Sequence, residues 1–390
     1  IYTEWSTNEK VAMDAGAGAA YSGRRTLITT KQVGVNVLSD SLLYAVYTGA
    51  EAALVVVTAD DPGLFSSQNE QDNRWYARLA KIPLLEPADS QEAKDFVVLA
   101  TELSEKFDTP VMIRTVMRTS HSKSIVNLGQ RPPTPDKVER FPRNPEKYNC
   151  TASNAKHMHP KVEQRLLDIA EYADTAAFNR IEWRNRSIGI ITSGVIYAYV
   201  SDVFPNASVL KLGMTYPLPR KMIKEFAAGV DKLVVIEELD PVLDEQIRAM
   251  GLEVIGKEVC PPCLELLPDD IKRYSAKAGL LPVEENPETE AFKDIPVRTP
   301  ALCPGCPHRS TFYLLNKMKL PVAGDIGCYN LGTLPPFRAQ HTMGAMGASI
   351  GVLHGMSLAD IPENRVCTIG DSTFFHSGMA PLVNMVHNNT

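Results

Sequence analysis

A Gly-Asp-Ser turn near the carboxyl end is the first place where this sequence could do chemistry. Gly370-Asp371-Ser372 follows residues 365–369, an apolar stretch typical of a buried strand. A carboxylate there lies at the carboxyl edge of a parallel sheet, where α/β proteins bind their ligands. It could ligate Mg²⁺, which takes few protein ligands and bridges phosphate oxygens. Taken alone, the turn is better explained by a capping aspartate.

A glycine-rich stretch precedes this turn, from His341 to Gly351, and includes Gly344 and Gly347. Each glycine inside a helix costs about 1 kcal/mol relative to alanine. The cost is tolerable where the backbone must approach a ligand or another helix closely. We predict a helix over residues 343–354 whose free amino-terminal amide groups bind a diphosphate. Close packing of the helix on a sheet explains the glycines nearly as well.

Near the amino end, Glu9 opens a predicted helix that runs to residue 21, is capped by Asn8 and is rich in small residues. On its own, Glu9 is explained by the helix dipole, which favours acids in the first turn. Residues 29–36 form a loop that contains Gly34 and Asn36, follows a strand and opens a helix. A long polar loop, residues 59–72, follows the next strand, and such loops often line a site or a partner surface.

Composition bounds the class of protein. The 390 residues are 44% hydrophobic and 22% charged, which is typical of a globular protein with a core. The net charge of −6 argues against a general nucleic-acid binder. No apolar run approaches the roughly 20 residues that span a membrane, and no signal peptide is visible. Seven cysteines without a secretion signal predict reduced thiols or metal ligands in a cytoplasmic protein.

The order of predicted elements indicates an α/β fold of parallel sheets flanked by helices. Strands are predicted at 27–30, 53–58 and 110–115, then at 187–192, 208–211 and 232–237, and finally at 321–326 and 365–369. Helices are predicted at 38–47, 90–106, 161–180, 196–203, 220–228 and 379–387. Segments rich in proline and charge separate these groups. The last sheet breaks off after a helix, so its next strand is absent.

Taken together, these motifs resemble the 2-oxoacid:ferredoxin oxidoreductases, a family of thiamine-diphosphate enzymes, and most of all the alpha subunits of the indolepyruvate type. The segments that carry the resemblance are residues 66–72 (SSQNEQD), 114–121 (RTVMRTSH), 303–309 (CPGCPHR), 325–330 (DIGCYN) and 370–377 (GDSTFFHS). Ser372 stands where the wider group has glycine. The resemblance covers essentially the whole chain.

The resemblance implies a division into five parts. They are a pyrimidine-binding domain truncated at its amino end (1–130), a linker with a helix (131–184), a domain similar to the carboxyl-terminal domain of transketolase (185–265), a second linker (266–297), and a diphosphate-binding domain truncated at its carboxyl end (298–390). It also implies residues before Ile1, and a continuation beyond Thr390 that completes the diphosphate motif and adds a ferredoxin-like domain with [4Fe-4S] clusters.

The resemblance also implies roles for individual residues. The carboxyl group of Glu9 bonds the pyrimidine ring of thiamine diphosphate and favours the imino tautomer, which generates the reactive ylide. Asp371 ligates Mg²⁺. The other residues expected around the cofactor are Gly34, Asn36, Cys306, His308, Gly327, Cys328, Gly344, Gly347, Gly370 and Ser372.

Two groups of cysteines keep alternative interpretations. Cys303, Cys306 and Cys328 could bind an iron–sulfur cluster, although we favour loops that shape the cofactor pocket. The C-x₂-C pair Cys260 and Cys263 is interpreted as linker sequence and not as a zinc site.

Arg114, Arg118 and His121 follow a strand end. They could bind a substrate carboxylate, or form salt bridges at a domain junction.

The implied reaction is oxidative decarboxylation of an aryl 2-oxoacid such as indolepyruvate. Coenzyme A takes the acyl group, and ferredoxin takes the electrons. A smaller beta subunit is the expected partner, and neither nucleic acid nor a membrane is expected. The alternatives are a non-redox thiamine-diphosphate decarboxylase, and a scaffold that kept the fold without the cofactor.

Overall fold

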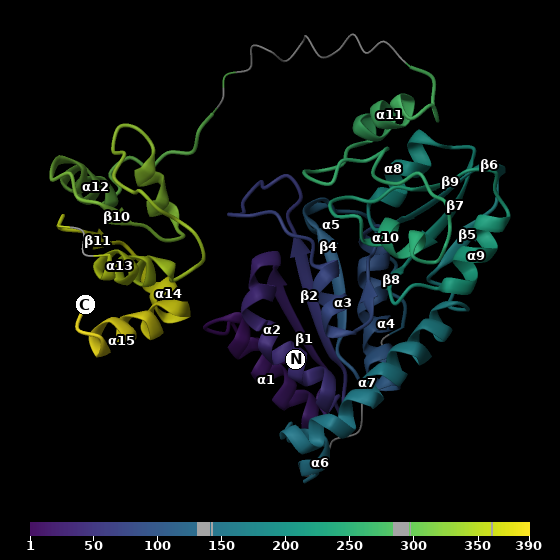
Figure 1. Ribbon diagram of the computed structural model, residues 1–390, viewed down its shortest axis with the longest axis horizontal. Coiled ribbons are helices and arrows are strands. Elements are labelled where there is room, and N and C mark those ends of the chain that lie inside the picture. The colour runs from purple at the N-terminus through teal and green to yellow at the C-terminus, as the bar shows by residue number, and fades with distance from the viewer. Residues whose placement is uncertain (131–140, 142, 284–295, 297, 360–361) are drawn as a thin grey trace. The chain divides into compact units, whose positions relative to one another are not determined.

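The computed structural model describes residues 1–130, 141, 143–283, 296, 298–359 and 362–390. The chain forms two compact units, Ile1–Glu284 and Glu285–Thr390. Figure 1 shows the helices and strands of each unit. In the described part of the chain, every helix is too short or too polar to cross a membrane.

The first unit contains a five-stranded sheet in the order β1-β2-β4-β3-β8. β1, β2, β4 and β3 pair in parallel, and β8 pairs with β3 antiparallel. The strands are β1 (Thr26–Lys31), β2 (Leu54–Asp60), β3 (Leu84–Leu85), β4 (Val111–Val116) and β8 (Met214–Tyr216).

Helices cover both faces of this sheet, so its strands are apolar on both sides. Alternate residues of β2 point to opposite faces. Val56 packs with α1 (Glu9–Tyr21), α2 (Gln32–Thr48) and α3 (Arg74–Ala80). Val55 packs with α4 (Ser90–Phe107) and with the second half of α7 (Ala152–Ala173). Two short helices, α5 (Met117–His121) and α6 (Pro145–Tyr148), complete this part.

A second, four-stranded sheet in the same unit has the order β5-β7-β6-β9. β6 pairs in parallel with β7 and β9, and β5 pairs antiparallel with β7. Helices α8 and α11 pack into one core cluster and α9 and α10 into another. The elements are β5 (Arg180–Glu182), β6 (Asn185–Ser193), α8 (Ile196–Val203), β7 (Ala207–Leu212), α9 (Arg220–Ala228), β9 (Leu233–Val235), α10 (Val242–Arg248) and α11 (Pro268–Lys277).

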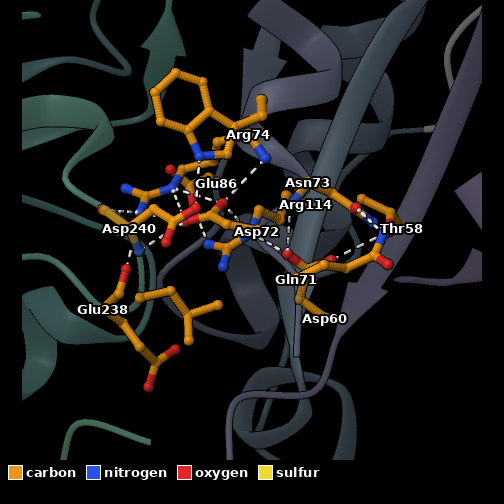
Figure 2. A network of polar contacts seen from close by, with 12 residues as sticks. Thr58, Asp60, Gln71, Asp72, Asn73, Arg74, Glu86, Arg114, Glu238 and Asp240 are labelled. Carbon is orange, nitrogen blue, oxygen red and sulfur yellow. Dashed lines mark hydrogen bonds and ion pairs between the residues drawn. The ribbon is translucent and has the colours of Figure 1, made fainter. Parts of the chain in front are cut away.

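A buried ionic network joins the two sheets (Figure 2). Arg74, at the start of α3, donates to Asp72 and to Glu237, each at 2.5 Å, and it also donates to the carbonyl oxygen of Glu238. Arg114, on β4, donates to Asp60 at 2.6 Å and to Glu86 at 2.5 Å. Two guanidinium groups therefore bind four buried carboxyl groups, those of Asp60, Asp72, Glu86 and Glu237, and the buried Glu238 carboxyl group accepts from the Leu266 amide.

The network divides its acids into two kinds. Burial alone would raise the pKa of Asp72, but Arg74 and Arg114 lower it to about 2. Burial raises the pKa of Asp60 and of Glu237 in spite of the same arginines. Burial also raises the pKa of Glu238 to about 7, although the amide of Leu266 and Arg114 act in the opposite direction. Asp60, Glu237 and Glu238 are therefore harder to ionise in the fold than Asp72.

We expect Glu238→Gln to stabilise the protein at alkaline pH. A carboxyl group whose pKa is 4.5 in the ordinary state and about 7 in the fold contributes stability below pH 4.5 that is lost as the pH rises through 7. The neutral amide avoids this loss. The free energy of unfolding at pH 8 should rise by up to about 3 kcal/mol, and at pH 4.5 it should change little. Denaturant unfolding at both pH values measures this, and the exposed Glu225→Gln is the control. Equal effects at the two pH values would contradict the assignment.

The second unit has a small two-stranded parallel sheet in which Val322 of β10 (Val322–Ala323) pairs with Val366 of β11 (Val366–Cys367). Leu302, Phe312, Tyr329 and Ala339 form its core cluster. The remaining elements are α12 (His308–Lys317), the 3₁₀ helix η2 (Cys328–Thr333), α13 (Ala348–Leu358), α14 (Asp371–Thr373), the π-helical turn η3 (Phe374–Gly378) and α15 (Met379–His387).

Several elements differ from their predicted bounds. The helix predicted at 343–354 begins only at Ala348, because Gly347 has a φ of +82° that a helix does not accept. The helix predicted at 38–47 begins at Gln32. The helix predicted at 161–180 spans residues 152–173. Within the predicted linker 266–297, α11 packs against α8, and residues 284–295 and 297 lie outside the described residues.

Candidate functional site

The structure brings Glu9 and Gly34 into contact, although they lie on different helices. Glu9 is the first residue of α1, whose start is fixed by the Asn8 side chain accepting from Val11 N at 2.9 Å. Gly34 lies in the first turn of α2. A Cβ atom at Gly34 would lie 2.7 Å from Glu9 Cγ and Oε1, and 2.0 Å from Thr30 Oγ1. The absence of a side chain at Gly34 therefore makes room for the Glu9 carboxyl group.

This contact predicts an unusual result for Gly34→Ala. Alanine in place of glycine in a helix usually stabilises a protein by about 1 kcal/mol. Here overpacking against Glu9 and Thr30 should reverse the sign and cost about 1–3 kcal/mol. The matched control is Gly18→Ala on α1, where an added Cβ meets no atom within 4 Å. Thermal unfolding of both variants checks this, and stabilisation of both would show that the carboxyl group moves away freely.

Asn36 is oriented by neighbouring polar groups. It accepts from Tyr76 Oη at 2.6 Å and donates to Gln71 Oε1 at 3.1 Å. Gln71, in the polar loop 59–72, donates to the carbonyl oxygen of Gln32, the first residue of α2. The side chain of Gln32 in turn donates to the carbonyl oxygen of Asn69 in the same loop. The predicted loop thus folds onto the start of α2, next to Gly34.

In the second unit, the Gly370-Asp371-Ser372 turn follows β11 and opens the short helix α14. The Gly370 amide donates to Tyr329 Oη at 3.1 Å. Asp371 and Ser372 are exposed, and Asp371 Oδ1 accepts from the Ser372 amide at 2.8 Å. An exposed carboxylate at the end of a parallel strand fits the oxygen donors that Mg²⁺ prefers.

The glycine-rich segment differs from our prediction in which groups its amides bind. Gly347 N donates to Asp325 Oδ1 at 2.9 Å, and Ser349 N donates to Asp325 Oδ2 at 3.0 Å. These two amides at the start of α13 are therefore not free for a diphosphate. A Cβ at Gly347 would lie 2.6 Å from Ser377 Cβ, so this glycine serves close packing, whereas a Cβ at Gly344 meets no atom within 4 Å.

Cys306 and His308 lie together before and at the start of α12. The sulfur of Cys306 is 3.3 Å from His308 Nδ1, and the ring of His308 lies 6.1 Å from that of Tyr329. Gly327 and Cys328 lie in the loop that enters η2, and Cys303 and Cys328 are exposed. Among the residues that the structure describes, no three His, Cys, Asp or Glu side chains are grouped so that they could hold a metal.

The three candidates for a substrate carboxylate have different surroundings. Arg114 is buried and bound by the ionic network, which favours the salt-bridge alternative for this residue. Arg118, on α5, is 47% exposed and pairs with Glu265. Two of its three guanidinium nitrogens, Nε and Nη2, donate to that carboxylate, which raises the pKa of Arg118. His121 is exposed at the end of α5.

Comparison with known proteins finds a family match in each unit. Residues 5–181 match the family described as "Pyruvate flavodoxin/ferredoxin oxidoreductase, thiamine diP-bdg", and residues 325–390 match "Thiamine pyrophosphate enzyme, C-terminal TPP binding domain". An alignment of 412 residues that covers the whole chain gives 41% identity to the indolepyruvate oxidoreductase subunit IorA of Methanothermobacter thermautotrophicus. It belongs to the 2-oxoacid:ferredoxin oxidoreductase family, in the group of the indolepyruvate oxidoreductase subunits.

Other comparisons agree with this family. The IorA subunit of Pyrococcus horikoshii is 39% identical over 428 residues. The chain spans 66% of the length of both IorA relatives. A solved 2-oxoglutarate:ferredoxin oxidoreductase from Magnetococcus marinus superposes with a TM-score of 0.54 at 20% identity, over 71% of this chain and 57% of that one. The predicted thiamine-diphosphate-binding fold of parallel sheets flanked by helices is confirmed.

Three residues that position parts of the candidate site were not predicted as site residues. Asp325 binds the start of α13, Tyr329 binds the Gly370 amide, and Gln32 joins the polar loop to α2. For Asp325 a signal existed, since an acid that directly follows an apolar strand often lies at a ligand-binding edge. For Tyr329 and Gln32 the partners lie 41 and 29 residues away, and no local pattern indicates such pairs.

Proposed function

We propose that this chain is the thiamine-diphosphate-binding part of an enzyme that oxidatively decarboxylates aryl 2-oxoacids of the indolepyruvate type. Coenzyme A receives the acyl group and ferredoxin receives the electrons. The whole-chain similarity to IorA subunits, at 41% identity, is the observation that carries the proposal. The chain spans 66% of those relatives, so the activity is a property of the longer protein.

Glu9 is the proposed catalytic residue. When bound, thiamine diphosphate supplies the carbon nucleophile and the electron sink for the reaction. The contribution of the protein is a carboxyl group that exchanges a proton with the pyrimidine ring. Contact between Glu9 and Gly34 supports this role, because a helix glycine that leaves space for one particular carboxyl group is costly unless that space is used. Asn36, two residues further along α2, is held by Tyr76 and Gln71.

Asp371 is the proposed Mg²⁺ ligand, with Gly370 and Ser372 near the diphosphate. The exposure of Asp371 and Ser372, and the strand end that carries all three residues, support this proposal. A Cβ added at Gly344 would meet no atom within 4 Å, so there is room for a ligand beside this part of the backbone. Gly347 supports the turn before α13 by packing on Ser377. We propose that the pocket is shaped by Cys306, His308, Gly327 and Cys328. The ring of His308 lies near that of Tyr329, whose hydroxyl accepts from the Gly370 amide.

Arg118 and His121 are the proposed contacts of the substrate carboxylate. A planar guanidinium group binds a carboxylate with two parallel hydrogen bonds, as Arg118 already does with Glu265. Substrate binding at Arg118 therefore requires exchange of one carboxylate partner for another. Arg114 is not included in this proposal, because its Nε and Nη1 are already bound to Asp60 and Glu86.

Membership of the family supports a proposal about partners. We propose a smaller beta subunit, ferredoxin and coenzyme A as partners, and [4Fe-4S] clusters as the route of the electrons. The solved relative from Magnetococcus marinus has 2-oxoglutarate, coenzyme A and succinyl-CoA bound, which supports coenzyme A as the acceptor.

We also propose the division into domains given above, from 1–130 to 298–390. The two family matches, at 5–181 and 325–390, support its outer parts. The structure adds two details. β8, at residues 214–216, belongs to the first sheet although it lies in the middle part of the chain, and α7 packs against α2.

Reconstitution of the full-length subunit with its smaller partner subunit tests the activity. With indolepyruvate, coenzyme A, thiamine diphosphate and Mg²⁺, the complex should reduce ferredoxin and release CO₂ in a fixed ratio. Release of CO₂ without reduction of ferredoxin would indicate a non-redox decarboxylase. Failure to bind the cofactor would indicate a scaffold.

A further inference from the structure

A short loop that begins at Asp325 leads into η2, and together they contact both elements expected around the diphosphate. At one end of the loop, Asp325 is fully buried and accepts three backbone amides, those of Ile326, Gly347 and Ser349, at 2.8–3.0 Å. A carboxylate has about four acceptor positions, so three amide donors satisfy most of them. Asp325 thereby fixes the Gly347 turn and the start of α13.

At the start of η2, Tyr329 contacts the Gly-Asp-Ser turn. Its hydroxyl donates to the carbonyl oxygen of Ile326 at 2.8 Å and accepts from the Gly370 amide at 3.1 Å. Burial raises the pKa of Tyr329, so the phenol keeps the proton that it donates. The same Ile326 carbonyl accepts from Thr373 Oγ1 at 3.4 Å, which adds a second connection to α14.

Sterics point to the same arrangement. The Tyr329 ring is 9% exposed and packs in the core cluster with Phe312 and Leu302. A Cβ at Gly370 would lie 3.1 Å from Tyr329 Cε1, and a Cβ at Gly327 would lie 2.3 Å from the same atom. The ring therefore fits between two glycines of the proposed cofactor site, and its position limits where the Gly370 backbone can lie.

We propose that Asp325 and Tyr329 are positioning residues that set the spacing between the Gly344–Gly347 segment and the Gly370-Asp371 turn. Asp325 holds the first element through the amides of Gly347 and Ser349, and Tyr329 holds the second through the amide of Gly370. Neither residue needs to touch the cofactor. The inference rests on the proposed function, since the spacing matters only if both elements bind one diphosphate and its Mg²⁺.

Tyr329→Phe is the sharpest test, because it removes one oxygen and leaves the ring in place. Loss of a single buried hydrogen bond between positioned groups predicts a rise of about 3- to 10-fold in the dissociation constant for thiamine diphosphate at saturating Mg²⁺, measured by calorimetry on the full-length subunit. Turnover at saturating cofactor should change less than the apparent KM for the cofactor. The control is Tyr313→Phe, an exposed tyrosine on α12 in the same unit.

Asp325→Asn is the second variant. The asparagine oxygen can still accept from one of the Gly347 and Ser349 amides, but the amide nitrogen that replaces the other oxygen cannot accept. It should weaken cofactor binding more than Tyr329→Phe does, and should also lower the melting temperature. If Tyr329→Phe lowers the melting temperature but leaves the dissociation constant equal to that of wild type, the two residues are structural only and the inference is wrong. If wild type itself binds no cofactor, the proposed function fails as well.

Discussion

Glu9→Gln should reduce turnover of the reconstituted enzyme by at least about 100-fold while the subunit still binds thiamine diphosphate. Proton exchange by a positioned carboxyl group typically contributes 10²–10⁴-fold to rate. Glutamine has almost the same shape, so the space over Gly34 stays filled and the fold should be unaffected. Steady-state kinetics and cofactor calorimetry measure the two effects separately.

A matched control for this variant lies on the same helix. Asp14→Asn removes an exposed carboxyl group on α1 whose ion pair with Lys10 is at the surface. Such pairs contribute little, so activity and stability should stay near wild type. If Glu9→Gln retained more than a tenth of the wild-type turnover, Glu9 would not be the catalytic acid and the assignment of α1 would be wrong.

Arg74→Met should have the largest effect on stability. Arg74 is 2% exposed, and its removal leaves Asp72 and Glu237 buried without the cation that both contact. Breaking a buried ion pair by removing one partner costs about 3–5 kcal/mol. Methionine replaces most of the volume, so the effect should come from the uncompensated carboxylates and not from a cavity.

Arg74 lies on α3, which packs on the first sheet, and Glu237 follows β9 of the second sheet. Loss of the ion pair between them should therefore also weaken the connection between the two sheets. Denaturant unfolding of the full chain gives the change in free energy, with the exposed Arg24→Met as control. A change below about 1 kcal/mol would show that the network is not the main connection. Adding Asp72→Asn and Glu237→Gln to Arg74→Met should recover part of the loss, since neutral amides need no cation.

Sequence alone predicted the elements whose signal is local. The buried strand at 53–58 is observed as β2 at 54–60, and the helix at 90–106 as α4 at 90–107. An unbroken apolar run and a clear helical period carry these predictions. β3 and β8, of two and three residues, are too short for any periodicity, and tertiary pairing alone creates them.

The candidate site divides in the same way. Gly370-Asp371 and Glu9 could be predicted from their neighbours in sequence and from resemblance to a family. The function of Gly34 as space for Glu9 depends on two helices crossing, which a linear sequence does not show. The ionic network joins residues as far apart as Arg74 and Glu237, which are 163 positions apart. Salt bridges were one of the two predicted roles of Arg114, but its partners Asp60 and Glu86 could not be named from the sequence.

We propose that Glu9 binds the pyrimidine ring of thiamine diphosphate and that Asp371 binds the Mg²⁺ at its diphosphate. An experimental structure of the full-length subunit with thiamine diphosphate and Mg²⁺ tests it most directly. We expect the Glu9 carboxyl group to lie within hydrogen-bond distance of the pyrimidine ring, and Asp371 to be among the Mg²⁺ ligands. Density for the cofactor at a site that includes neither residue would contradict it.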